Sequence, residues 1–132
     1  MTGLVVVGAG GLGREVAAYA AAAFGADAVR GFLDDDAACA ADPRLTAPYL
    51  SPTSSGGGHR RWGPGDAGTT RPTDEHGRLA SVVHPTAVVS STTVLGEGCV
   101  LAPFVYVGPH AAVGNNVIVN VHSCVGHDTT LG

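Results

Sequence analysis

The sequence is poor in positive charge and in aromatic side chains. It has 132 residues with no lysine, and its 7 basic residues stand against 11 acidic ones, for a formal net charge of −4. A nucleic-acid-binding surface is disfavoured, because phosphate contacts need clustered Lys and Arg. Aromatic residues make up 5% of the chain, whereas there are 20 Gly and 8 Pro. This composition excludes a large aromatic core and favours a fold that brings backbone segments close together.

Long apolar runs and paired cysteines are also missing. The longest apolar stretch, residues 16–24, is too short to cross a membrane. The N-terminus has no basic segment ahead of an apolar one, so no secretory signal peptide is predicted. Cys39, Cys99 and Cys124 form no Cys-X-X-Cys pair, which is typical of reduced thiols. We therefore expect a cytoplasmic protein without a membrane partner.

Residues 1–36 carry the pattern of strand, glycine-rich turn, helix and strand that opens a Rossmann-like domain. The turn contains Gly8, Gly10 and Gly13, and such glycines let the backbone approach a phosphate at a helix N-terminus. Asp34 lies 21 residues beyond Gly13, where an acidic side chain reaches a ribose hydroxyl in NAD-binding domains. Taken alone, the pattern fits NAD binding, and it also fits a turn that binds no ligand.

Residues 37–78 interrupt this pattern. Between residues 51 and 77 there is no Val, Ile or Leu, and the apolar side chains are Trp62 and Ala67. Such a composition buries too little surface to offset the entropy of ordering the chain. We therefore predict an irregular, exposed linker over residues 37–78, without the further strands that a longer Rossmann-like domain would need.

Residues 79–132 contain a repeat of six residues. Every sixth residue from Val83 is aliphatic, and the residue four positions after each of these is small or β-branched. This period excludes an α-helix, whose period is 3.6 residues. It predicts a solenoid of short strands, with the aliphatic side chains inside and the small ones, Cys99 among them, at tight inner corners. The predicted inward residues are Val83, Val89, Leu95, Leu101, Val107, Val113, Val119, Val125 and Leu131.

The hexads resemble those of acyltransferases with a left-handed parallel β-helix, in which three hexads form one coil of about 18 residues. The opening Gly-Ala-Gly-Gly-Leu-Gly-Arg-Glu, then Gly-Phe-Leu-Asp-Asp-Asp, then Ser-Val-Val-His-Pro ahead of the hexads, is similar to the PglD/NeuD-type sugar acetyltransferases. The resemblance covers residues 3–36 and 79–132. It implies a homotrimeric enzyme that uses acetyl-CoA to acetylate, on nitrogen or oxygen, a nucleotide-linked amino sugar or a sialic acid. It also implies that a nucleotide sugar, rather than NAD, faces Gly8, Gly10, Gly13, Asp34 and Asp35.

A second part of the resemblance concerns the catalytic residues. In the family an Asn stands seven residues before a His that an acidic residue follows, and Asn120, His127 and Asp128 fit this pattern. The resemblance implies that His127 is a general base and that no metal is needed. Imidazole suits this task, because it can take a proton near neutral pH from the amine or hydroxyl that attacks a thioester. An adjacent carboxylate can fix the tautomer of the ring.

Two other interpretations stay open. His122 and His127 have the spacing of zinc ligands in gamma-class carbonic anhydrases, also left-handed β-helices, where His84 or His110 would supply the third ligand. The hexads also stop at Gly132 after fewer than three coils, whereas family members continue for several coils that bind CoA. The sequence therefore also fits a C-terminally truncated, inactive relative that serves as an oligomerisation or scaffold module.

Overall fold

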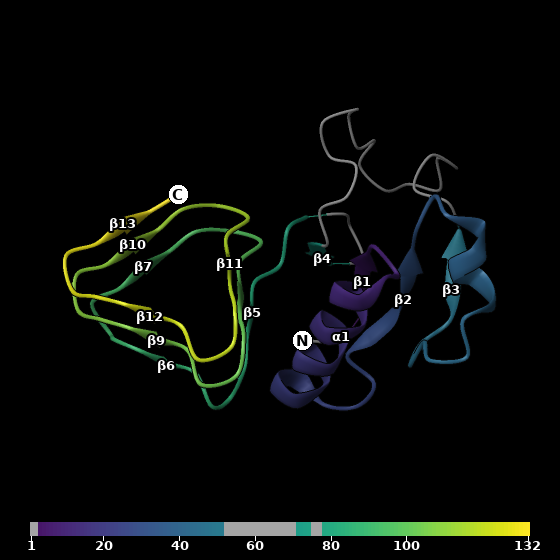
Figure 1. Ribbon diagram of the computed structural model, residues 1–132, viewed down its shortest axis with the longest axis horizontal. Coiled ribbons are helices and arrows are strands. Elements are labelled where there is room, and N and C mark those ends of the chain that lie inside the picture. The colour runs from purple at the N-terminus through teal and green to yellow at the C-terminus, as the bar shows by residue number, and fades with distance from the viewer. Residues whose placement is uncertain (1–2, 52–70, 75–77) are drawn as a thin grey trace. The chain divides into compact units, whose positions relative to one another are not determined.

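The structure is a computed structural model that describes residues 3–51, 71–74 and 78–132 (Figure 1). The chain forms two compact units, Met1–Ala80 and Ser81–Gly132. In the described part of the chain, no helix is long and apolar enough to cross a membrane.

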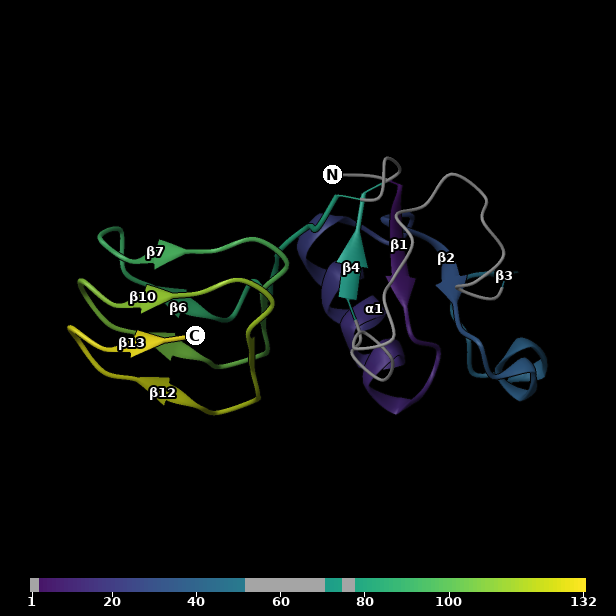
Figure 2. The ribbon, with the colours of Figure 1, turned by 90° about the horizontal axis from the view of Figure 1, so that it is seen from above.

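The first unit is built on a four-stranded sheet with the order β3-β2-β1-β4 (Figure 2). Strands β1, β2 and β3 are parallel, and β4 runs antiparallel to β1. The order β1, α1, β2 matches the one predicted for residues 1–36. The elements of this unit are β1 (Leu4–Val7), α1 (Gly11–Phe24), β2 (Val29–Leu33), the 3₁₀ helix η1 (Ala37–Ala41), β3 (Tyr49–Ser51) and β4 (Arg71–Thr73).

Helix α1 packs through its small residues and ends at a glycine. All four residues of β1 are buried, as expected of a strand in the middle of a sheet. Val16, Ala17 and Ala20 form the buried face of the Ala-rich helix, and Ala is the residue with the highest helix propensity. Gly25 follows the helix with a φ of 106°, and its N–H donates to the carbonyl of Ala21. Only glycine adopts this backbone conformation without strain, so Gly25 ends the helix.

The prediction of a strandless linker over residues 37–78 is wrong, because two short strands lie within that range. Strand β3 extends the sheet beside β2, and β4 pairs with β1. Pro72 and Thr73 are buried, and the Thr73 hydroxyl donates to a β1 carbonyl at 3.2 Å. An edge strand tolerates Pro and needs few aliphatic side chains, because backbone pairing with its neighbour supplies the interaction. Residues 52–70 and 75–77 lie outside the described residues, so the expectation for them stays a prediction.

The second unit is a parallel β-solenoid of triangular cross-section, seen end-on in Figure 1. Its three sheets have the orders β5-β8-β11, β6-β9-β12 and β7-β10-β13. Each strand pairs with one 18 residues away, as Val82 pairs with Val100 and Val100 with Ile118. This register confirms the predicted solenoid and its three hexads per coil. The strands are β5 (Val82–Val83), β6 (Val88–Val89), β7 (Val94–Leu95), β8 (Val100–Leu101), β9 (Tyr106–Val107), β10 (Ala112–Val113), β11 (Ile118–Val119), β12 (Cys124–Val125) and β13 (Thr130–Leu131).

The core of the solenoid follows the predicted phase. The inward residues of the three central strands, Leu101, Val107 and Val113, are at most 3% exposed. Leu131 is 37% exposed, because β13 lies at the edge of its sheet. Cys99 lies at an inner corner as predicted, fully buried, with its thiol 3.0 Å from a backbone carbonyl oxygen one coil away.

A second period of six appears in the backbone of the corners. Five non-glycine residues have φ between 55° and 60°, the left-handed region that Asn, Asp and His enter more readily than bulky residues do. Each one turns the chain between two faces of the solenoid. Phe104 is the bulky exception. The residues are Phe104, His110, Asn116, His122 and Asp128, and Gly98 continues the series.

Candidate functional site

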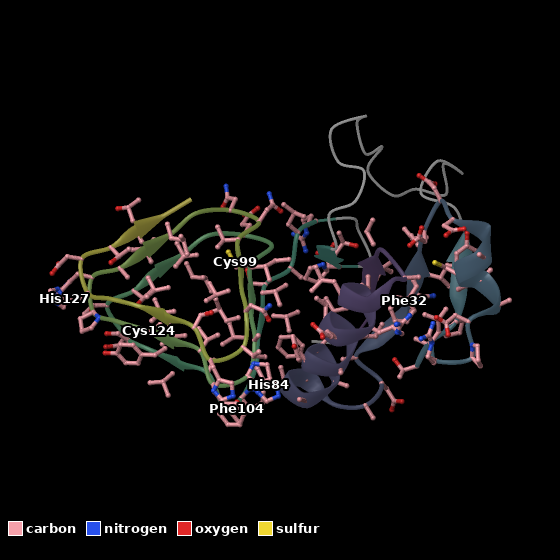
Figure 3. The ribbon with its side chains drawn as sticks, in the orientation of Figure 1. Phe32, His84, Cys99, Phe104, Cys124 and His127 are labelled. Carbon is pink, nitrogen blue, oxygen red and sulfur yellow. The ribbon has the colours of Figure 1, made fainter. Side chains whose placement is uncertain are left out.

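The corner between β12 and β13 carries an imidazole and a carboxylate in contact. His127 Nδ1 lies 2.7 Å from Asp128 Oδ2, and the two side chains are 80% and 69% exposed. A carboxylate oxygen only accepts, so it selects the neutral tautomer with the proton on Nδ1 and leaves Nε2 as the acceptor. Figure 3 shows His127 at the outer tip of the solenoid, pointing away from the core. The predicted pair is therefore brought together, with the free ring nitrogen of the neutral imidazole able to take a proton.

The backbone of the preceding coil holds this corner in place. The Asp128 N–H donates to the carbonyl of Pro109 at 3.0 Å, and the Gly108 N–H donates to the carbonyl of Val125 at 2.9 Å. A β-carbon at Gly108 would lie only 2.8 Å from the His127 backbone nitrogen. Glycine at position 108 is therefore required for the close approach of the two coils under the histidine.

Asn120, the third predicted catalytic residue, lies at a different corner, between β11 and β12. Its side chain is exposed, and its Oδ1 accepts a hydrogen bond of 2.8 Å from the N–H of Val121. Its backbone carbonyl accepts from Ser123. Within one chain, the structure does not bring Asn120 into the His127–Asp128 pair.

The corner that carries Asn120 also presents an aromatic stack that the sequence reasoning missed. The rings of Phe104 and His122 are stacked, with centroids 5.1 Å apart and planes 14° from parallel. Phe104 is 58% exposed, and its backbone N–H donates to the Thr86 hydroxyl at 3.1 Å. The signal in the sequence is the spacing of 18 residues between Phe104 and His122, which places them in register on successive coils.

The zinc interpretation finds no arrangement to support it. His122 lies at the corner after β11, and His127 lies at the corner after β12. Among the described residues, no group of three His, Cys, Asp or Glu side chains is placed to hold a metal ion. His84 Nδ1 lies 2.8 Å from the Thr86 hydroxyl instead.

In the predicted phosphate-binding turn of the first unit, the fold requires some of the glycines, whereas others border open space. Gly8 has a φ of 98°, and a β-carbon at Gly13 would collide with the carbonyl of Gly8, so the fold itself requires both glycines. A β-carbon at Gly10 or Gly11 would meet nothing within 4 Å. Helix α1 starts here without a side-chain cap, and the positive end of its dipole points at this open space.

The end of β2 contacts this turn directly. Asp34 Oδ2 accepts a hydrogen bond of 2.7 Å from the N–H of Ala9, inside the turn. The Tyr49 hydroxyl of β3 donates to the Asp34 backbone carbonyl at 2.7 Å. Asp35 is exposed on the surface next to it. The structure therefore brings Asp34 against the turn that contains Gly8, Gly10 and Gly13, and Tyr49 is a neighbour of Asp34 that the sequence did not reveal.

Burial, together with nearby negative charge, raises the pKa values of two neighbouring groups. Burial, followed by the charge of Asp34, raises the pKa of the Tyr49 hydroxyl. Burial also raises the pKa of the Cys39 thiol, and the carboxylates of Asp34 and Asp36 add to this effect. Both groups therefore keep their protons at neutral pH and can donate hydrogen bonds.

A second carboxylate links the start of α1 to the segment after η1. Asp42 Oδ2 lies 2.8 Å from Arg14 Nη1, and Asp42 Oδ1 lies 2.8 Å from Arg44 Nε. Hydrogen bonds from the Arg44 side chain and backbone lower the pKa of Asp42 from 3.8 to about 2. Arg14 follows Gly13 directly, so this ion pair fixes the far side of the glycine-rich turn.

Comparison with known proteins places these features in context. No protein-family model matches the chain. A 52-residue stretch, 39% of the chain, is 33% identical to GDP-perosamine N-acetyltransferase of Escherichia coli O157:H7. The solved structure of PerB from Caulobacter crescentus in complex with CoA and GDP-perosamine matches 98% of the chain, with a TM-score of 0.71 and 26% identity. The chain resembles the PglD/NeuD-type sugar acetyltransferases.

The fold likeness extends to a second solved structure. The acetyltransferase domain of PglB from Neisseria gonorrhoeae FA1090 matches 96% of the chain with a TM-score of 0.69 and 24% identity. The solenoid thus matches a left-handed β-helix, as predicted. The chain spans 65% of each of the two solved chains, and the matched stretch covers 24% of the Escherichia coli protein.

Proposed function

We propose that this chain acts in the transfer of an acetyl group from acetyl-CoA to the amino group of a nucleotide-linked amino sugar. The observation that carries the proposal is the hydrogen-bonded His127–Asp128 pair at a solenoid corner. The resemblance to PerB, solved with CoA and GDP-perosamine, supports both the donor and the class of acceptor.

His127 supplies the proton transfer in this proposal. Acetyl-CoA provides an activated thioester carbonyl. Nε2 of His127 takes the proton from the acceptor amine as the amine nitrogen bonds to that carbonyl carbon. When the carbon–sulfur bond breaks, the imidazolium returns the proton to the departing sulfur. Asp128 stabilises the imidazolium between these steps through its contact with Nδ1.

The first unit binds the nucleotide part of the acceptor in the same proposal. The open space beside Gly10 and Gly11 and the uncapped start of α1 suit a diphosphate, because backbone N–H groups and the helix dipole favour negative charge there. We assign the unit as a Rossmann-like nucleotide-sugar-binding domain on this basis. Asp34 and Asp35, which follow the last residue of β2, border the site.

A homotrimer completes the site. Asn120 and His127 lie at different corners of one solenoid, so a site that uses both would take them from neighbouring copies. Exposed apolar side chains on the outer faces, such as Val88 and Val94 at 60% and 67% exposure, support packing between copies. The same surfaces would also serve a chain that only assembles and has no activity.

The test is an acetyl-transfer assay with acetyl-CoA and GDP-perosamine, with the product detected by mass spectrometry. Acetylated sugar that disappears with His127→Ala and persists with Glu97→Gln supports the enzyme. Glu97 is a suitable control because it is exposed and lies between β7 and β8, at the corner that carries neither His127 nor Asn120. A chain that forms trimers but neither binds CoA nor acetylates the sugar would favour the scaffold interpretation.

A further inference from the structure

The carboxylate of Asp34 is engaged with backbone at both of its oxygens. Oδ2 accepts from the N–H of Ala9 at 2.7 Å, and Oδ1 accepts from the N–H of Asp36 at 2.9 Å. The first bond joins the end of β2 to the glycine-rich turn across 25 residues of sequence. The second closes a local turn that directs the chain toward η1. Hydrogen bonds to an ionised carboxylate are among the strongest in proteins.

Other groups converge on the same residue. The Tyr49 hydroxyl donates to the Asp34 carbonyl at 2.7 Å. The N–H of Gly8 donates to the carbonyl of Leu33, just before Asp34, at 2.7 Å. Asp34 thus connects β1, β2 and β3 at the edge where the turn begins.

We propose that Asp34 is a positioning residue, which holds the Gly8–Gly13 turn in its nucleotide-binding shape and does not itself contact the ribose. This inference rests on the proposed nucleotide-binding function of the first unit. It reassigns the residue from the ligand-contacting role that its position after β2 suggests. Ala9 is fully buried, so its N–H needs the carboxylate as a partner, and a ribose hydroxyl would compete with that bond.

Amide NMR on the full chain tests the hydrogen bonds without any ligand. Asp34→Asn keeps the size of the side chain but offers one acceptor oxygen instead of two. We expect the Ala9 and Asp36 amide protons to be far downfield in the wild type, and at least one of them to move upfield in the variant. Unchanged shifts for both amides would overturn the positioning role.

Affinity measurements distinguish a positioning role of Asp34 from direct contact between Asp34 and the ribose. Calorimetry compares GDP with 2′,3′-dideoxyguanosine diphosphate, which lacks the ribose hydroxyls. Asp34→Ala should lower the affinity for both ligands by the same factor. We expect a loss on the order of 10- to 100-fold, the range for losing a hydrogen bond to a charged group. A loss confined to GDP would show direct ribose contact and overturn the proposal, and so would unchanged affinity for both ligands.

A second variant covers the case in which Asp34→Ala does not fold. Tyr49→Phe removes only the hydroxyl that donates to the Asp34 carbonyl. It should lower the affinity for both ligands equally, by severalfold. Asp27→Ala, an exposed carboxylate before β2, controls for the change in net charge and should leave both affinities unchanged. An effect of Tyr49→Phe on GDP alone would contradict positioning. Failure of the wild type to bind either ligand would overturn the nucleotide-binding function itself, together with the role of Asp34 in it.

Discussion

Gly108 lies directly under His127, one coil earlier in the solenoid. A β-carbon at position 108 would lie 2.8 Å from the His127 backbone nitrogen and 3.1 Å from the carbonyl carbon of Gly126. Gly126 has no such restriction, since a β-carbon there would meet only the Thr129 hydroxyl, at 3.7 Å. The position of the candidate base is therefore set by a residue 19 positions earlier in the sequence.

Gly108→Ala should displace the His127 corner and destabilise the solenoid. The contact is with backbone, which cannot move aside as a side chain can, so we expect a loss of about 1–3 kcal/mol in the free energy of unfolding, typical of overpacking. Gly126→Ala is the matched control and should change this free energy by less than about 0.5 kcal/mol. Urea unfolding measures both. Equal effects of the two substitutions would show that the coils are not packed as described.

Leu101→Ala should be among the most destabilising substitutions in the solenoid. Leu101 is fully buried in β8, the central strand of its sheet, and its loss leaves a cavity that costs about 2–5 kcal/mol. Cys124→Ala, at an exposed position of β12, should cost less than about 0.5 kcal/mol. Thermal and urea unfolding would measure the difference. A larger effect at Cys124 than at Leu101 would mean that the inward phase is wrong.

Asp42→Asn should lower the melting temperature at neutral pH and have little effect in strong acid. The pKa of Asp42 is about 2 in the folded protein, below its usual value of 3.8, so the unfolded chain takes up a proton first as the pH falls. The stability that the charge contributes is therefore complete above about pH 4 and is lost toward pH 2. Melting curves from pH 2 to pH 7 should show wild type and variant converging at the acid end. Asp27→Asn is the exposed control, and a difference of the same size at pH 2 and pH 7 would contradict the Arg44 and Arg14 pairing.

The solenoid could be predicted because its signal is redundant. Each hexad repeats the same requirement for an inward aliphatic residue and a small corner residue, so an exposed member such as Leu131 does not change the conclusion. The parallel register then follows from the period.

The first unit was predicted less completely because its contacts are long-range and polar. Thr73 pairs with Val5 across 68 residues, and no local pattern in the sequence predicts that pairing. The bond from Ala9 to Asp34 likewise depends on two loops that meet only in the folded sheet. Asn120 stands seven residues before His127, just over one hexad, so the predicted period already places it at the preceding corner, and the fold separates it from His127 in one chain.

His127→Ala should remove acetyl transfer while leaving binding largely intact. The side chain is 80% exposed and contacts Asp128, so its removal takes away the base without disturbing the core. The assay is made on the chain itself, which spans 65% of the solved PerB chain. In an active protein, loss of a general base typically lowers the rate by about 10²–10⁴-fold. Calorimetry with CoA and GDP-perosamine should show affinities within a few-fold of the unsubstituted protein.

Asp128→Asn makes the role of the neighbouring carboxylate testable in the same assay. Asparagine can still accept a hydrogen bond from Nδ1, but it carries no charge to stabilise the imidazolium. The rate should therefore fall, though less than with His127→Ala, and the double variant should be no slower than His127→Ala alone, because the two residues act as one unit. Glu97→Gln, at the third corner of the solenoid, should keep the rate of the unsubstituted protein. Acetyl transfer that is indifferent to His127→Ala would remove His127 from the mechanism, and the base would then have to be sought at another corner of the solenoid.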